Sequence, residues 1–182
     1  MTTVEAEETT GLHGALSAPA RSPEIPESAD VYGWLVGSWA LEIALFKDGQ
    51  CVERGMKGEV HFGWVLEGRA VQDVWIRPVR SERGPDMEKK YNTYGTTLRV
   101  WDPAIQAWRV TWVNPVSGVR NELVGRRVGK DIVQVGTGAN GEPIRWNFTD
   151  ITPDSFRWTG ESLLPDGQTW RLEAEFRGTR VR

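Results

Sequence analysis

The chain has 182 residues, a length that suits one domain, and its 22 lysines and arginines nearly balance 25 aspartates and glutamates, for a net charge of −3. This balance gives no electrostatic case for binding nucleic acid or an anionic membrane surface, which would show as a strong basic excess or stripe. The single cysteine, Cys51, excludes an intrachain disulfide and a cysteine-based zinc cluster.

Residues 1–29 are rich in Thr, Glu, Ala, Pro and Ser, which predicts a disordered tail. They contain neither a basic start nor an apolar stretch, so we expect no signal peptide. The sequence contains no apolar run of about 18 residues that could span a membrane. The lack of such a run and the single cysteine together favour a cytoplasmic protein. One domain is expected over residues 30–182, opening with a short helical turn at 30–36.

From there the chain predicts about ten short strands separated by turns. The first strand shows the alternation that places every second side chain on one face, as in Trp39, Leu41 and Ile43. Asp48-Gly49 and Asp166-Gly167 have the composition of tight hairpin turns. The strands are expected at 38–46, 51–66, 69–79, 95–101, 108–114, 119–128, 131–135, 144–149, 156–163 and 169–177.

The consecutive hairpins favour an all-β, closed antiparallel up-and-down barrel over a two-sheet sandwich. Closing the sheet removes the two unpaired edges that an open sheet would leave. The ten tryptophans suggest a wide interior that small aliphatic side chains would leave hollow. The polar segment 80–92 is too charged for a strand and is a candidate flap.

Gly37-Ser38-Trp39, at the start of the first strand, resembles the G-x-W signature of lipocalin-like (calycin) barrels. The resemblance implies that Trp39 plugs one end of the barrel and that a late arginine packs across it. Arg177 is our first choice for that arginine, and Arg180 is the alternative.

The segments 68–75, 98–112 and 155–170 are similar to a group of uncharacterised bacterial lipocalin-like proteins. Together with the G-x-W signature, the resemblance covers most of residues 32–180. It implies a fold and no single activity, because calycin barrels include binders of apolar ligands and cofactor-free enzymes.

Hairpin registers predict which residues face the lumen. With Glu67-Gly68 as a two-residue turn, Phe62 opposes Asp73, and opposed residues share a face. The apolar face then carries Asp73, Trp75 and Arg77 inward.

The same argument, applied to three further hairpins, adds more polar residues to the lumen. It predicts Arg99 opposite Val110 and, through a Ser117-Gly118 turn, Asn121 on the face of Trp112. At the last hairpin it places Glu161 inward together with Trp170. A one-residue bulge would flip any of these assignments.

These polar residues allow two interpretations. Asp73 with Arg77 or Arg99 is either a ligand clamp or acid–base pair, or a structural ion pair that keeps buried charges partnered. Glu161 is a candidate general base, and Asn121 either orients a ligand or bonds neighbouring backbone. His61 is expected to point outward, and the composition predicts neither a metal site nor a cofactor.

Three functions follow as hypotheses. The first is binding of a small hydrophobic or aromatic molecule by a monomer or homodimer, under a lid that includes Tyr91 and Tyr94. The second is a cofactor-free isomerase, cyclase or decarboxylase that uses Asp73, Arg99 or Glu161. The third is a structural module with a filled core. The predicted ligand-binding residues are Trp64, Trp75, Arg77, Trp108, Trp112 and Asn121.

Overall fold

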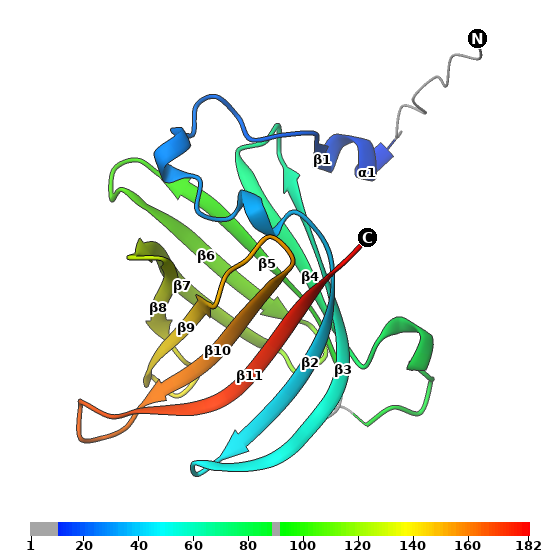
Figure 1. Ribbon diagram of the computed structural model, residues 1–182, viewed down its shortest axis with the longest axis vertical. Helices are drawn as coiled ribbons and strands as arrows, with labels where there is room; N and C mark the ends of the chain where they lie inside the picture. Colours follow the sequence, from blue (N-terminus) through cyan, green and yellow to red (C-terminus); the bar gives the residue numbers. More distant parts are fainter. Residues whose placement is uncertain (1–10, 89–91) are drawn as a thin grey trace.

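The computed structural model describes residues 11–88 and 92–182, and they form a closed antiparallel barrel (Figure 1). Its elements are α1 (Gly11–Leu16), β1 (Ser17–Ala18), the 3-10 helices η1 (Glu27–Ala29), η2 (Gly33–Leu35) and η3 (Arg80–Glu82), and the strands β2 (Gly37–Lys47), β3 (Gln50–Val65), β4 (Ala70–Arg77), β5 (Thr93–Asp102), β6 (Ala107–Asn114), β7 (Val119–Val128), β8 (Asp131–Thr137), β9 (Pro143–Thr149), β10 (Ser155–Leu163) and β11 (Trp170–Val181).

Ten strands, β2 to β11, make the barrel wall in an up-and-down order. Each strand pairs with the next, and β2 also pairs with β11, so the sheet has no free edge. The barrel and the strand number predicted from the hairpin pattern are confirmed. The short helical turn expected before the first strand is η2.

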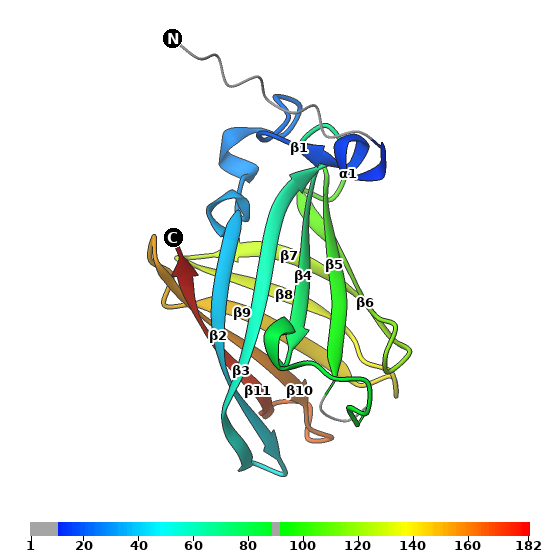
Figure 2. The same ribbon diagram turned by 90° about the vertical axis from the view of Figure 1, so that its right-hand side faces the viewer.

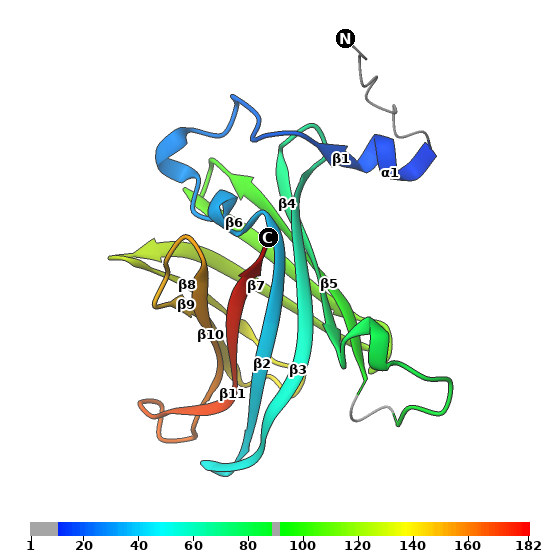
Figure 3. The ribbon, with the colours of Figure 1, turned by 45° about the vertical axis from the view of Figure 1, so that its right-hand side comes forward.

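The two ends of the barrel differ. At the end where β2 begins, which we call the closed end, the chain that precedes β2 folds across the opening (Figures 1 and 2). At the other end, the open end, β2 and β3 extend as a long hairpin beside the β10–β11 turn (Figure 3). Buried side chains such as Trp39, Tyr32 and Trp108 fill the barrel interior in the closed half.

Residues 11–29 are more ordered than their composition predicted. Ile25 and Ala29 are buried and belong to the hydrophobic core, and the backbone N–H of Ser22 donates to the carbonyl of Gly68. This segment is ordered because it packs apolar groups against the barrel, although it has few of them. Residues 1–10, also assigned to the predicted tail, lie outside the described residues.

Trp39 plugs the closed end, as the G-x-W resemblance implied. It is fully buried, and its indole N–H donates to the carbonyl of Leu35 at 2.7 Å. Gly37 has a φ of +126°, a backbone conformation that favours glycine, and a Cβ there would lie 2.9 Å from Nη1 of Arg180 and would displace that guanidinium.

The arginine that crosses Trp39 is Arg180, and the first choice of Arg177 is corrected. The guanidinium of Arg180 lies 4.0 Å from the Trp39 ring centroid and donates to the carbonyls of Trp34 and Val36. Arg177 instead pairs on the barrel exterior with Glu175. The sequence placed the end of the last strand at residue 177, whereas β11 runs to Val181 and carries Arg180 to the closed end.

Candidate functional site

A cavity of about 290 Å³ occupies the open half of the lumen. It reaches from the middle of the barrel to the ends of β2, β4 and β6, and seven strands contribute to its wall. This volume is at the lower end of the range for small-molecule sites. The lining residues are Leu45, Trp75, Arg77, Thr93, Thr97, Arg99, Trp112, Asn114, Trp146, Trp158 and Phe176.

Aromatic rings form one continuous wall of this cavity. The Trp158 ring centroid lies 4.8 Å from Phe176, 5.7 Å from Trp146 and 5.9 Å from Trp75. Trp112 continues the series, with its centroid 6.5 Å from Trp146. Such rings contribute large apolar area and have few rotamers.

A glycine makes room for one of these rings. A Cβ at position 95 would lie 2.4 Å from Cη2 of Trp112, a distance that no real side chain tolerates. Gly95 therefore allows the Trp112 indole to approach the backbone of β5, and Trp112 lines the cavity.

Asp73 and Arg99 form a buried ion pair in the middle of the barrel. Nη1 of Arg99 donates to Oδ2 of Asp73 at 2.5 Å, and the two side chains are 2% and 0% exposed. The other carboxylate oxygen of Asp73 accepts the backbone N–H of Thr97 at 2.7 Å. Both oxygens of Asp73 are thus engaged, and Asp73 itself does not line the cavity.

The closed-end side of this ion pair is packed with aromatic groups. The Arg99 guanidinium lies 5.1 Å from the Tyr32 ring centroid and 5.6 Å from that of Phe62. The Tyr32 hydroxyl donates to Oε1 of Gln134 at 3.1 Å. Burial raises the pKa of Tyr32 well above its usual value, against a smaller opposing effect of Arg99. Tyr32 is therefore a neutral, structural phenol.

Arg77 lies at the rim of the cavity, on the same strand face as Trp75. It is partly buried and pairs with Thr93 across the β4–β5 hairpin. Burial lowers the pKa of the Arg77 guanidinium, and the charge of Glu53 opposes this shift. An arginine keeps its proton despite such a shift, so the rim carries a positive charge.

A shallower recess of about 710 Å³ adjoins the cavity and shares Trp146 and Trp158 with it. The loop after β8 and the turn between β10 and β11 border it, through residues such as Glu142 and Pro165. The aromatic wall is thus reached from solvent at the open end.

Glu161 borders this recess but does not face the lumen as predicted. It pairs with Arg145, and Nε of Arg145 donates to Oε2 of Glu161 at 2.6 Å. Both residues alternate with the inward-facing Gly160 and Trp146, so they belong to the barrel exterior. A register shift between Gly160 and Glu161 produces this outcome, because it turns Trp170 outward, where Arg145 stacks on it at 4.3 Å.

Two predicted ligand-binding tryptophans belong to the closed half instead. Trp108 is 1% exposed, and its indole N–H donates to the carbonyl of Ala29 at 2.8 Å. Trp64 packs beside it, with ring centroids 6.5 Å apart. Inward orientation was predicted correctly, but hairpin registers do not reveal which part of the lumen the preceding chain fills.

Asn121 is buried opposite Trp112, but Asn114 lines the cavity in its place. The β6–β7 turn is longer than the two residues expected, and Asn114 pairs with Val119. The register is therefore shifted by two residues, which keeps every side chain on its predicted face and moves each one along the barrel axis.

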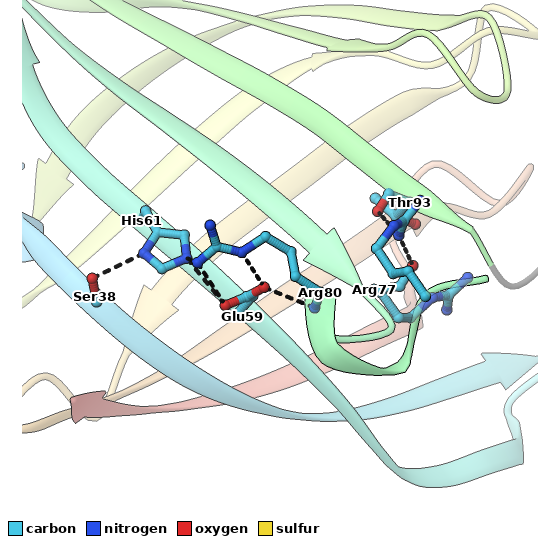
Figure 4. Close-up of polar contacts among 7 residues, drawn as sticks. Ser38, Glu59, His61, Arg77, Arg80 and Thr93 are labelled. Atoms are coloured by element: carbon cyan, nitrogen blue, oxygen red, sulfur yellow. Dashed lines mark hydrogen bonds and ion pairs between the residues drawn. The ribbon is translucent and has the colours of Figure 1, made fainter. Parts of the chain in front are cut away.

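The described part of the 80–92 segment projects outside the barrel wall near the open end (Figures 2 and 3), and Arg80 at its start contacts the exterior of β3. The Nε atom of Arg80 donates to Oε1 of Glu59 at 2.7 Å, and His61 lies between Glu59 and Ser38, at 3.2 and 2.9 Å (Figure 4). The hydrogen bond from Arg80 lowers the pKa of Glu59 to about 2. His61 points outward, as expected.

The lid prediction is corrected for Tyr94 and is untested for Tyr91, which lies outside the described residues. Tyr94 alternates with the inward-facing Gly95 and is 42% exposed. Arg83 covers the ring of Tyr94 on the exterior, at 5.0 Å, and donates to the carbonyls of Arg77 and Thr93.

Seven lining residues were missed by the sequence reasoning: Trp146, Trp158, Phe176, Thr93, Leu45, Thr97 and Asn114. The first three do alternate with polar neighbours, in IRWNFT, SFRWTG and EAEFR, so a signal was present. The long 138–142 loop gave no register, however, and strand alternation alone does not tell which face is inward.

Two properties of the described residues concern other kinds of site. In the ranges 11–88 and 92–182, no group of three or more His, Cys, Asp or Glu side chains is placed to hold a metal ion. Over the same ranges, no helix has the length and apolar character needed to cross a membrane.

Known proteins give a match at the level of the fold. No protein-family model and no curated protein matches the chain. The S-type phycobiliprotein lyase CPES from Guillardia theta matches with a TM-score of 0.53 and 13% identity, over 84% of this chain and 92% of that chain. A de novo designed fluorescence-activating β-barrel matches with a TM-score of 0.31 and 15% identity, over 84% and 98%.

The match to the lyase shows the fold alone, because the sequence identity is so low. The chain has the lipocalin-like barrel architecture that the G-x-W resemblance implied. The match to the designed barrel carries no argument at its TM-score. Membership of the bacterial lipocalin-like group stays a prediction.

Proposed function

We propose that the protein binds a small hydrophobic or aromatic molecule in the cavity at the open end of the barrel. The observation that carries the proposal is the continuous wall of five rings around a hollow of about 290 Å³. Apolar walls with a few convergent polar groups are typical of small-molecule sites. Here the polar groups are Arg77, Thr93, Thr97, Arg99 and Asn114.

The hollow supports binding over the filled-core hypothesis. In a purely structural barrel, side chains would interdigitate on both sides of Trp158 and Phe176, since protein interiors are close-packed. The closed half, around Trp39 and Tyr32, is packed in this way. The contrast between the two halves of one barrel therefore favours a site in the open half.

The contacts of two carboxylates favour binding over turnover. The enzyme hypothesis needs a general base beside the bound molecule, and it named Asp73 and Glu161. Asp73 accepts hydrogen bonds from Arg99 and Thr97 behind the cavity wall. Glu161 is paired with Arg145 on the exterior.

The test is a titration of the intrinsic tryptophan fluorescence with aromatic compounds, including N-phenyl-1-naphthylamine. We expect saturable quenching or energy transfer that weakens in Trp112→Phe, because Trp112 lines the cavity. Trp34→Phe is the matched control, since Trp34 packs against Trp39 at the closed end. A wild-type protein that shows no saturable response to any compound would contradict the proposal. Mass analysis of the mixtures would reveal turnover.

A further inference from the structure

The cavity and the neighbouring recess meet at a shared pair of rings. Trp146 and Trp158 line both the cavity of about 290 Å³ and the recess of about 710 Å³. Their ring centroids lie 5.7 Å apart, and the ring planes are inclined at 57°. A molecule that contacts these rings in the cavity therefore also lies at the border of the recess.

A glycine determines the position of one of the shared rings. Gly160 lines the recess, and a Cβ there would lie 2.8 Å from Cη2 of Trp158 and 3.7 Å from Cδ1 of Trp146. The first distance is too short for a real side chain, so Gly160 allows the Trp158 ring to approach the backbone of β10. The border between the two hollows thus depends on this residue.

The wall of the recess beyond this border is largely apolar. It is formed by the start of β9, the end of β10, the turn that follows and the first half of β11. Removing apolar ligand surface from water against such a wall is favourable. The apolar residues that line the recess are Ile144, Trp146, Trp158, Leu163, Leu164, Pro165 and Ala174.

The charged side chains at the β11 side of the recess are partnered with each other. Nε of Arg171 and Oγ of Ser162 both donate to Oε1 of Glu173, at 2.9 and 2.7 Å. Nη1 of Arg171 also pairs with Oδ1 of Asp48, at 3.3 Å. This group of side chains satisfies its own charges.

The two other carboxylates on the described lining of the recess also accept hydrogen bonds. Nε of Arg145 donates to Oε2 of Glu161 at 2.6 Å, and Oε2 of Glu142 accepts the backbone N–H of Asn140 at 3.0 Å. A charged group on a ligand would compete with these existing partners, whereas an uncharged group leaves them intact. The recess therefore suits an uncharged, apolar group.

Resting on the proposed function, we infer that the ligand is an elongated molecule of two linked apolar parts, of which the outer part is uncharged. The inner part lies in the cavity along Trp158 and Phe176. The outer part continues past Trp146 into the recess, against Leu164 and Ala174. The cavity alone is at the lower end of the usual range of about 300–1,000 Å³, and the recess provides the room for a longer molecule.

The experiment compares 1-naphthylamine, which has one ring system, with N-phenyl-1-naphthylamine, which carries a second ring. Both probes are uncharged at neutral pH, and titration of the tryptophan fluorescence gives the affinity of each. We expect the longer probe to bind the wild-type protein about tenfold more tightly or better, because burial of a phenyl ring contributes at least the roughly 1.4 kcal/mol that corresponds to tenfold.

A variant that fills the recess separates this inference from a general preference for larger probes. Ala174→Phe should exclude the second ring and reduce the preference for the longer probe to about threefold or less, since the burial of that ring is lost. Binding of 1-naphthylamine reports whether the cavity of the variant is intact. Ala40→Phe is the matched control, because Ala40 is exposed on the outer face of β2, and it should keep the full preference.

A second variant tests the recess without adding volume. Leu164→Ala removes apolar surface from the recess, so it should weaken the longer probe about threefold or more and 1-naphthylamine by less than about twofold. Leu12→Ala, at an exposed position of α1, is the matched control and should change neither affinity.

The inference and the proposed function fail in different ways. Equal wild-type affinities for the two probes would overturn the inference and leave the proposed function standing. An Ala174→Phe variant that keeps the full preference for the longer probe, or a Leu164→Ala variant that weakens both probes equally, would also overturn it. If neither probe binds the wild-type protein, both ideas fail.

Discussion

Replacing Asp73 by asparagine tests whether the central ion pair is structural. The Asp73→Asn side chain would keep a similar volume but would leave Arg99, whose side chain is 2% exposed, without a counter-charge among aromatic rings. Breaking a buried ion pair from one side costs about 3–5 kcal/mol. For a domain of this length, 1 kcal/mol lowers the melting temperature by about 2–4 °C, so we expect a decrease on the order of 10 °C.

The assays are thermal unfolding, which gives the melting temperature, and urea unfolding, which gives the free energy of unfolding, both followed by tryptophan fluorescence, with Asp102→Asn as the matched control. The ion pair of Asp102 with Arg109 is on the surface, so its loss should cost about 1 kcal/mol or less. The double variant Asp73→Leu with Arg99→Met removes both charges and should recover at least half of the stability lost in Asp73→Asn. If Asp73→Asn is no less stable than Asp102→Asn, or the double variant recovers nothing, the reasoning is refuted.

Other contacts give three further predictions. Arg180→Ala should destabilise the protein by about 2–3 kcal/mol, because its hydrogen bonds to two backbone carbonyls and its stacking on Trp39 are lost. Arg177→Ala should destabilise it by less than about 1 kcal/mol. Urea unfolding measures both, and equal effects would contradict the prediction. Gly95→Ala should weaken binding of N-phenyl-1-naphthylamine several-fold, because its Cβ displaces the Trp112 ring into the cavity; an unchanged affinity would show that this ring does not border the site. The pKa of Glu59 is lowered to about 2, so its stabilising effect of about 1 kcal/mol should be complete above pH 4.5 and should disappear as the pH falls towards 2. The test compares the free energies of unfolding in urea of the wild-type protein and Glu59→Gln. A difference between them that persists at pH 2 would refute the prediction.

The sequence predicted the barrel and several residues of its interior because tight turns fix register. The turn at Glu67-Gly68 placed Asp73 opposite Phe62, and the structure confirms that pairing. The pairing of Arg99 with Val110 is likewise confirmed. In both hairpins, one face is so apolar that its inward orientation follows from burial.

The errors arose where the local pattern carries less information. The shift at Gly160 and Glu161 leaves no mark in the alternation of β10 and β11, yet it places Glu161 outside. The long loop before β9 gave no register for that strand, so the inward orientation of Trp146 was not predicted. Trp108 lies outside the cavity because the segment before β2, which includes Ala29, packs over it at the closed end. This segment has the composition of a disordered tail, so its position could be found only from the structure.

The seam between β2 and β11 has a consequence for how the protein is made. These strands are the first and the last of the barrel, so the contact that closes it joins residues such as Trp39 and Arg180, far apart in the chain. A nascent chain emerging from the ribosome carries β2 with one edge unpaired until β11 has been synthesised. Long-range pairing of this kind slows folding and leaves the edge open to other chains. Closure of the barrel therefore follows the synthesis of β11, and until then the unpaired edge of β2 is open to pairing with other chains.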